Sequence, residues 1–192
     1  MSCVDGDERE VRECEASQKA GCSANGSAGA SPSQNLPSQS LPSRKRIDHS
    51  VFIPPSGPVI VFVTVCTKAK ARWLATSECH ALLKEVWLEA DSWIVGRYVV
   101  MPDHVHLFAA PGERVLPLEN WVSYWKSLFT KRHGAPGHRW QSRCWDRRLR
   151  SDESYAEKWA YVRENPVRHG LVAVAEDWPF QGELNDLQWF SG

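Results

Sequence analysis

The chain has 192 residues, a length that suits one folded domain. Its 23 Lys and Arg balance 23 Asp and Glu, so the formal net charge is zero, which usually argues against a nucleic-acid partner. The charge is unevenly spread, however, because residues 121–150 hold eight Lys or Arg and one acid, Asp146. A basic stretch of this kind favours a partner that carries phosphates.

The sequence lacks the marks of secreted and membrane proteins. No apolar run approaches the ~20 residues of a transmembrane helix, and the acidic, polar N-terminus does not resemble a signal peptide. The six cysteines form no CxxC pair. We therefore expect reduced thiols and a cytoplasmic protein, associated with the nucleoid if its partner is DNA.

Residues 1–45 differ in composition from the rest of the chain. They are rich in Ser, Gly, Ala, Pro, Gln and Asn and poor in bulky apolar residues. Such a segment cannot offset the entropy of ordering, so we expect a disordered tail followed by one folded domain over residues 46–192. An upstream start codon chosen in error would account for this tail equally well.

The domain begins with alternating strand and helix signals. Apolar, β-branched runs predict strands, and apolar residues at helical spacing predict helices. In chain order we expect a strand over 59–67, a helix over 76–90, strands over 93–101 and 104–110 joined by a tight turn, a helix over 118–134, an extended basic segment over 139–150, and a last helix from about 151 to 165, stopped by a proline. This order predicts a ferredoxin-like α+β sandwich, with the helices on one face of an antiparallel sheet and the other face open.

Two histidines interrupt the apolar run "VVMPDHVHLF" (99–108). Residues two apart on a strand point to the same side, so His104 and His106 share one face and Val105 and Leu107 share the other. If the valine and leucine pack under the helices, the imidazoles emerge on the open face, spaced to chelate one cation. Two polar residues tolerated on a half-exposed sheet face would give the same pattern.

The last predicted helix carries two kinds of side chain. Tyr155, Trp159 and Val162 fall within about 60° of each other and form the stripe expected to face the core. Tyr161 and Asn165 lie off this stripe, one turn apart, and could direct a phenol and a carboxamide oxygen into one site. The plainer interpretation is a tyrosine on the flank of the helix and an asparagine that ends it.

Several separated motifs together resemble one known family. The segments "VVMPDHVHLF" (99–108), "CWDRRLRSDESY" (144–155), "YVRENPVRHGLV" (161–172) and "DWPF" (177–180) are similar to the REP-associated branch of the single-tyrosine HUH transposases. The likeness covers about residues 58–180. The chain departs from the family at "IDHSVFIPPSGP" (47–58), which lacks a basic and aromatic lead-in, and at His169, where a small residue is common.

The resemblance implies an HUH nuclease domain that cuts and rejoins single-stranded DNA at hairpin-associated, REP-like sites. The His-hydrophobe-His motif falls on His104 and His106, the nucleophilic tyrosine on Tyr161, and the third, polar metal ligand on Asn165. A divalent cation at these residues would polarise the scissile phosphate, and mixed nitrogen and oxygen ligands permit Mg²⁺ or Mn²⁺. Tyr161, with an ordinary pKa of about 10, would form a 5′-phosphotyrosyl link and leave a free 3′-hydroxyl.

The resemblance leaves alternatives open. A domesticated DNA-binding protein could keep the fold without catalysis, although all four site residues are present. A zinc hydrolase is less consistent with the sequence, because no HExxH helix is found. The expected partner is single-stranded DNA with hairpin structure, bound by a monomer or a homodimer.

The basic stretch supplies candidates for DNA contacts. Its Lys and Arg side chains could follow a phosphate backbone, and its tryptophans Trp140 and Trp145 could stack unpaired bases. Alternatively these two tryptophans belong to the core, as we expect for Trp125. The predicted DNA-binding residues are Lys126, Lys131, Arg132, Arg139, Arg143, Arg147, Arg148 and Arg150.

Overall fold

The structure is a computed structural model and describes residues 59–114, 116–149 and 152–187. The predicted tail, residues 1–45, lies outside this part of the chain. The elements in chain order are β1 (Val61–Cys66), the 3-10 turn η1 (Lys68–Lys70), α2 (Ser77–Glu89), β2 (Trp93–Val100), β3 (His104–Pro111), α3 (Leu118–His133), β4 (Trp145–Arg148), α4 (Asp152–Arg163), α5 (Asn165–Arg168), the 3-10 turn η2 (Ala175–Asp177) and β5 (Gln181–Glu183).

Five strands form one sheet in the order β4-β1-β3-β2-β5, and every neighbouring pair is antiparallel. Strand β1 lies between β3 and β4, and all six of its residues are buried. The first four strands and the two helices α2 and α3 have the strand order and connections of a ferredoxin-like fold. The predicted α+β class and antiparallel sheet are therefore confirmed.

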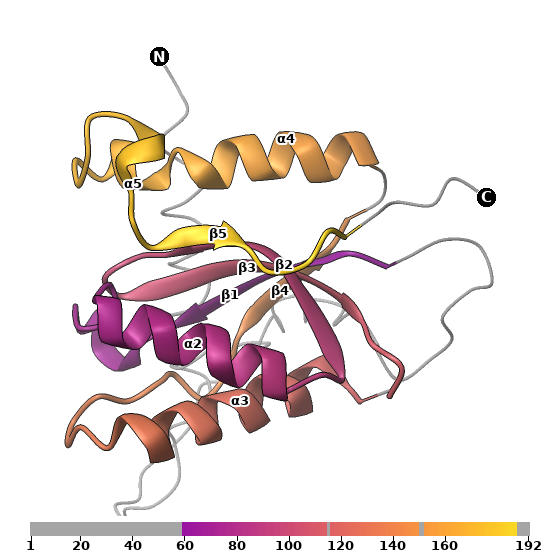
Figure 1. Cartoon of the computed structure of the whole chain (residues 1–192), viewed down its shortest axis with the longest axis vertical. Helices are drawn as coiled ribbons and strands as arrows, with labels where there is room; N and C mark the ends of the chain where they lie inside the picture. Colours follow the sequence, from indigo (N-terminus) through magenta and orange to yellow (C-terminus); the bar gives the residue numbers. More distant parts are fainter. Residues whose placement is uncertain (1–58, 115, 150–151, 188–192) are drawn as a thin grey trace, which may run out of the picture.

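The sheet separates two apolar layers, which Figure 1 shows almost edge-on. On one side α2 and α3 cover alternate residues of the central strands, such as Val63 and Leu107. On the other side, where Figure 1 shows α4, Phe62 and Phe108 belong to a second apolar cluster, separate from the one under α2 and α3. Alternation along a strand sends successive side chains to opposite faces, so these phenylalanines need a second apolar cover.

This second layer differs from the open face expected from the sequence. The predicted core stripe of the last helix supplies the cover, since Tyr155 and Val162 are buried and the Tyr155 ring lies edge-on to Phe108 with 5.0 Å between centroids. Trp159 also contacts Phe108. The stripe was predicted, but a strand pattern alone does not tell which face of the sheet a later helix will cover.

Local sequence signals explain where the helices begin and end. The Thr76 hydroxyl accepts from the backbone N–H of Cys79 at 3.2 Å and caps α2. Helix α3 ends at Gly134, whose φ of 62° lies in the left-handed region that glycine adopts readily. Helix α4 ends at Arg163, and Pro166 then sits in the first turn of α5, where a missing N–H costs nothing. The proline therefore opens a new short helix as well as ending the old one.

The predicted strands correspond closely to the observed ones, with two differences. Of the extended basic segment, residues Trp145–Arg148 form the edge strand β4, and Trp140 makes an isolated bridge to Thr67. The short strand β5, at the other edge, was not predicted. Three residues are too few for the alternating pattern by which strands are recognised in a sequence.

Helix α2 offers a matched test of the packing. Leu83 is fully buried against the sheet, whereas Leu88 on the same helix is 62% exposed. We expect Leu83→Ala to lower the free energy of unfolding by about 2–5 kcal/mol and Leu88→Ala to change it by less than about 0.5 kcal/mol. Urea denaturation followed by tryptophan fluorescence measures both, and equal losses would contradict this orientation of α2.

Candidate functional site

His104 and His106 lie at the start of β3 on the face that α4 covers. Both are buried, with 2% and 0% of their surface exposed, while Val105 and Leu107 pack with α2 and α3 on the opposite face. The predicted division of the two faces is confirmed. The histidines are enclosed in the molecule, however, and not on an open surface.

The two imidazoles converge on each other. Their Nε2 atoms are 3.1 Å apart, and their Nδ1 atoms point outward to different partners. The Nδ1 atom of His104 lies 2.6 Å from a carboxylate oxygen of Asp103, and that of His106 lies 2.8 Å from the Thr64 hydroxyl. Outer partners of this type orient imidazoles that bind a metal through the other nitrogen.

Asp103 fixes the proton of His104. Burial raises the pKa of this carboxyl, but the hydrogen bond from His104, with the charges of His104 and Lys70, outweighs burial and holds the pKa below its usual value. The ionised carboxylate can only accept, so the proton of neutral His104 belongs on Nδ1 and its Nε2 carries a lone pair. This lone pair points at His106.

Thr64 allows His106 to adapt. If His104 carries its proton on Nδ1, we infer that without a metal the His106 Nε2–H donates to His104, 3.1 Å away, and that the His106 Nδ1 accepts from the Thr64 hydroxyl. If a cation were bound by both histidines, the proton of His106 would move from Nε2 to Nδ1, and the Thr64 hydroxyl oxygen would accept a hydrogen bond from it. Both lone pairs would then face the same point, so the pair fits a metal.

Tyr161 lies near this pair through a short chain of contacts. The Phe62 ring stacks on His106 with 5.4 Å between centroids and 24° between planes. The Lys158 ammonium lies 4.5 Å from the centre of Phe62 and 5.0 Å from the centre of Tyr161. The guanidinium of Arg168 also lies on the Tyr161 ring, 4.1 Å from its centre. The Nη2 atom of Arg168 donates to the Tyr161 carbonyl at 2.7 Å.

Asn165 is fully buried at the first position of α5. Its carbonyl accepts from the backbone N–H of His169 at 2.9 Å, and the His169 ring lies 6.5 Å from the His104 ring. This turn therefore lies beside the histidine pair. No group of three or more His, Cys, Asp and Glu side chains suited to a metal occurs among the described residues. A third protein ligand from these residues would have to be of another type, such as the Asn165 carboxamide.

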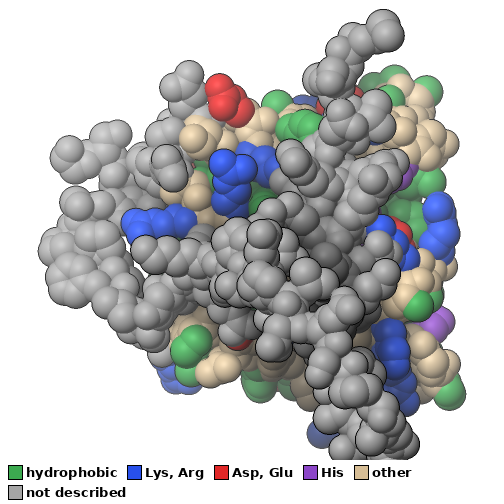
Figure 2. Space-filling view, turned by 180° about the vertical axis from the view of Figure 1, so that it is seen from behind, with side chains coloured by type: hydrophobic (Ala, Val, Ile, Leu, Met, Phe, Trp, Pro, Cys, Tyr) green, Lys and Arg blue, Asp and Glu red, His purple; other side chains and the backbone are tan. Residues whose placement is uncertain are grey.

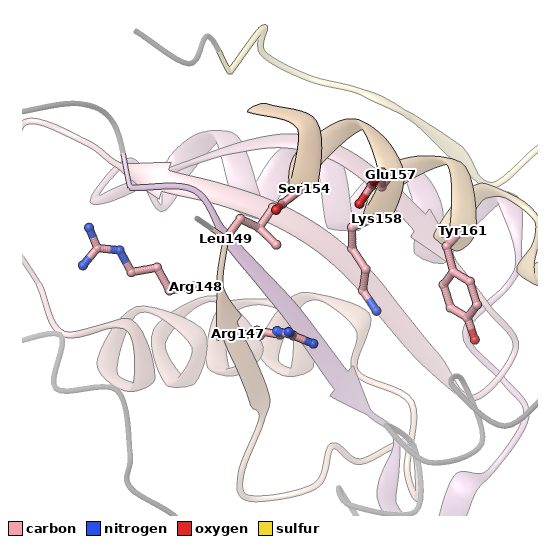
Figure 3. A pocket seen from close by; sticks show the side chains of 7 residues that line it. All are labelled: Arg147, Arg148, Leu149, Ser154, Glu157, Lys158 and Tyr161. Carbon is pink, nitrogen blue, oxygen red and sulfur yellow. The ribbon is translucent and has the colours of Figure 1, made fainter. Parts of the chain in front are cut away.

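A cavity of about 660 Å³ opens beside Tyr161. Figure 3 shows that α4 and the end of β4 supply its walls, with Lys158 and Tyr161 extending from the helix toward the strands. Both strand and helix contribute basic groups. The lining residues are Arg147, Arg148, Leu149, Ser154, Glu157, Lys158 and Tyr161.

Lys126 needs a correction among the predicted DNA contacts. It is only 8% exposed, and its ammonium donates to the carbonyls of Gln141 and Ser142 at 2.6 and 3.2 Å. It therefore connects α3 to the segment before β4 and does not present its charge to a phosphate. The helical pattern placed it off the apolar face, but the loop that covers it comes from a distant part of the chain.

The other predicted basic residues are divided between the two sides of the sheet. Lys131 and Arg139 are exposed with α3, and Arg132 pairs with Glu89 of α2. Arg143, Arg147 and Arg148 are exposed before and on β4, and Arg150 lies outside the described residues. Figure 2, seen from behind, shows Lys and Arg side chains at several places on this face. None of the contacts to DNA is tested by this arrangement, so they stay predictions.

The tryptophans of the basic stretch belong mainly to the core. Trp125 is fully buried, as expected. Trp140 packs edge-on against Trp73, Trp125 and Phe129. Trp145 is half-buried against Phe62 at 5.8 Å. Their packing accounts for both rings without a stacked base.

Sequence reasoning missed Thr64, Asp103 and Lys158. The signal for Asp103 was its place directly before the histidine motif, where a carboxylate can reach the outer nitrogen of the first imidazole. Lys158 lies one turn before Tyr161, the spacing at which helical side chains meet. Thr64 had no local signal, because only the pairing of β1 with β3 brings it opposite His106.

The hydrogen bonds predict different tautomers for the two histidines. In the metal-free protein near pH 8 we expect His104 to be protonated on Nδ1 and His106 on Nε2, because Asp103 accepts from the first and Thr64 donates to the second. Long-range ¹H–¹⁵N NMR spectra distinguish these forms. Asp103→Ala should weaken the preference at His104, and protonation of His104 on Nε2 in the unmodified protein would contradict the assignment.

No family model matches the chain. A REP-associated tyrosine transposase of Haemophilus influenzae is 29% identical over 102 residues, which span 46% of this chain and 58% of that protein. One of Escherichia coli is 29% identical over 135 residues, spanning 66% of this chain and 77% of that protein. The first match thus covers less than two thirds of its relative.

A solved structure is also similar. It shows a REP-associated tyrosine transposase bound to a REP hairpin, with 25% sequence identity and a TM-score of 0.59, over 72% of this chain and 81% of that one. Among the described residues, no helix combines the length and apolar character needed to span a membrane. In sequence and in fold, the chain is similar to REP-associated tyrosine transposases.

Proposed function

We propose that the protein is a metal-dependent DNA strand-transfer enzyme that cleaves and rejoins single-stranded DNA at hairpin-associated sites through a link to Tyr161. The observation that carries this proposal is the contact chain from the converging pair His104 and His106 through Phe62 and Lys158 to Tyr161. The homologues support the class of reaction, and the similar structure, bound to a REP hairpin, supports a hairpin substrate.

Helix α4 carries two tyrosines, and their surroundings favour Tyr161 as the nucleophile. Tyr155 is 6% exposed and packs on Phe108. Burial, despite the opposing charge of Arg97, raises its pKa to about 12, which disfavours the phenolate that attacks phosphorus. Tyr161 instead lines the cavity, and the cations of Lys158 and Arg168 lie on its ring. These charges favour negative charge on its oxygen.

The proposed reaction conserves the phosphodiester. The Tyr161 oxygen forms a bond to phosphorus while the bond to the 3′-oxygen breaks, and the 3′-oxygen gains a proton as the phenol loses one. The 5′-phosphate is then linked to the protein. Attack by a 3′-hydroxyl of another strand reverses these changes, so rejoining needs no nucleotide cofactor.

His104, His106 and Asn165 are the residues that would hold Mg²⁺ or Mn²⁺. Two imidazoles with an oxygen ligand suit Mn²⁺ better than Mg²⁺. When bound, the cation would withdraw charge from the scissile phosphate and the leaving oxygen. Asp103 and Thr64 keep both imidazoles turned to this point.

The basic cavity also suits a protein that binds DNA without cutting it. The features that favour an enzyme are the buried, converging histidines, because burying two polar rings is costly and a binding surface does not need them. A domesticated binder would bind hairpin DNA but form no covalent product. The two classes are thus separated by the same assay that identifies the nucleophile.

The nucleophile is tested by replacing each tyrosine of α4. Hairpin oligonucleotides taken from inverted repeats beside the gene are incubated with protein and Mn²⁺, and covalent adducts are resolved on denaturing gels. Tyr161→Phe should abolish the adduct with DNA binding retained, because only the attacking oxygen is removed. Tyr155→Phe, the matched control, should keep it. Loss of the adduct in Tyr155→Phe alone would show that Tyr161 is not the nucleophile.

The metal is tested by removal and by substitution. EDTA should stop adduct formation, and Mg²⁺ or Mn²⁺ should restore it. His104→Ala should also abolish the adduct and lower the affinity for Mn²⁺ in calorimetry. Thr64→Val, which removes only an outer partner, should weaken Mn²⁺ binding by roughly 10–100-fold. Full activity in EDTA would exclude the proposed role of the cation.

A further inference from the structure

Helix α4 presents a second stripe beside its core stripe. Ser154, Lys158 and Tyr161 recur at intervals of four and three residues, and all three line the cavity. Side chains at these intervals lie above one another on one face of a helix. The helix thus buries Tyr155 and Val162 in the apolar layer while it lines the cavity with this polar stripe.

The Lys158 side chain is held close to the site. Its ammonium lies over the rings of both Phe62 and Tyr161, at 4.5 and 5.0 Å from their centres. A cation over two aromatic faces gains electrostatic attraction from each, which restrains an otherwise flexible side chain. In Figure 3 the ammonium reaches into the space between α4 and the strands, on the side where the Tyr161 hydroxyl also points.

A second cation faces the same space from the sheet. Arg147 is the β4 partner of Phe62 in the register of β1 with β4, and it lines the cavity. Paired residues of antiparallel strands point to the same face, so the guanidinium shares the face of Phe62 and His106. The lining also includes the carboxylate of Glu157, against three basic side chains. The excess of positive charge suits an anion.

We propose that this cavity binds the phosphodiester that Tyr161 attacks, and that Lys158 positions this phosphate. The proposal rests on the function proposed above and adds to it a residue and a subsite. Lys158 would contact a non-bridging oxygen and Arg147 the phosphate from the opposite wall. Negative charge grows on these oxygens as the phenol oxygen attacks and the 3′-oxygen leaves, so fixed cations help more in the transition state than in the bound substrate.

Lys158 does not act as a base in this scheme. An ammonium group has three donors and no lone pair, so it cannot take the phenol proton. Arg168 has a different role, because its guanidinium lies on the Tyr161 ring and donates to the Tyr161 carbonyl. It would hold the ring in place, while Lys158 holds the group to be attacked.

The first experiment measures binding without cleavage. All variants carry Tyr161→Phe, and fluorescence anisotropy follows a labelled twelve-residue oligothymidylate over a range of salt. Lys158→Met should weaken binding on the order of tenfold and flatten the slope of log affinity against log salt by about 0.7. Lys158→Arg should keep most of the affinity. Lys84→Met on α2, on the other side of the sheet, should leave binding unchanged.

The second experiment locates the phosphate. The cleaved hairpin is prepared with an uncharged methylphosphonate at the scissile position, and adduct formation is timed. With the natural phosphate, Lys158→Met should slow the reaction by about 10²–10³-fold, mainly in kcat. With the methylphosphonate, the same substitution should cost less than about tenfold, because the lysine no longer faces a charged oxygen.

The outcomes separate this inference from the proposed function. Equal losses on both substrates, or oligothymidylate binding unaffected by Lys158→Met, would overturn the role of Lys158 even if the adduct forms. If the unmodified protein forms no adduct but Lys158→Met still weakens binding, the cavity binds phosphates and the proposed reaction fails. Restoration by Lys158→Arg argues against misfolding as the cause of a loss.

Discussion

The antiparallel pairing of β1 with β3 is the constraint on which the candidate site depends. It sets Thr64 opposite His106 and Cys66 opposite His104. A slip of one residue would turn the imidazoles toward α2 and α3, into a layer of valines, leucines and tryptophans. The all-apolar sequence of β1 on that side strongly disfavours such a slip. The same burial that stabilises the sheet thus fixes the site.

The burial of the histidines also explains their hydrogen bonds. A polar ring taken from water must find partners in the protein, or the fold loses stability. Each imidazole has one partner outside the pair and its neighbour inside it. The shared contact between the Nε2 atoms is the one that a cation would replace. The pair is therefore satisfied as it stands and keeps two nitrogens directed at one point.

Helix α4 connects this site to the rest of the fold. Its core stripe packs on Phe108, and its polar stripe lines the cavity. Because both stripes belong to one rigid element, the packing of Tyr155 also fixes the position of Tyr161. Phe62 links the apolar layer under α4 to the candidate site, since its ring touches Phe108, His106 and the Lys158 ammonium.

The sequence predicted what depends on local patterns. Alternation placed His104 and His106 opposite Val105 and Leu107, and helical spacing placed Tyr161 off the core stripe. The structure confirms the first; Tyr161 lines the cavity, but it is also partly buried against the apolar layer under α4, as Trp159 is. Thr64 could not be found in this way, because its partner is 42 residues away. The same limit applied to Lys126, whose acceptors lie 15 and 16 residues further along the chain in a loop without a regular pattern.

The fold also separates residues of the basic stretch that are neighbours in the sequence. Its residues are contiguous in sequence, and its Lys and Arg side chains were predicted to follow a phosphate backbone. The fold instead places Lys131 and Arg139 with α3 and Arg147 with α4, on opposite sides of the sheet. The edge strand β4 is the part of the sheet that lies between these groups.

This separation limits how one DNA strand could use the basic residues. A strand lying in the cavity beside Tyr161 meets Arg147 and Lys158 but not the cations on α3, unless it bends around the edge at β4. Under the proposed function, the phosphates near the scissile position would then be held by few, well-placed charges. In such an arrangement the contribution of a side chain depends on its distance from Tyr161 more than on the total charge of the stretch. Lys158 lies beside Tyr161 although it is outside the basic stretch. Lys126 belongs to the basic stretch, but its ammonium is bound to the carbonyls of Gln141 and Ser142.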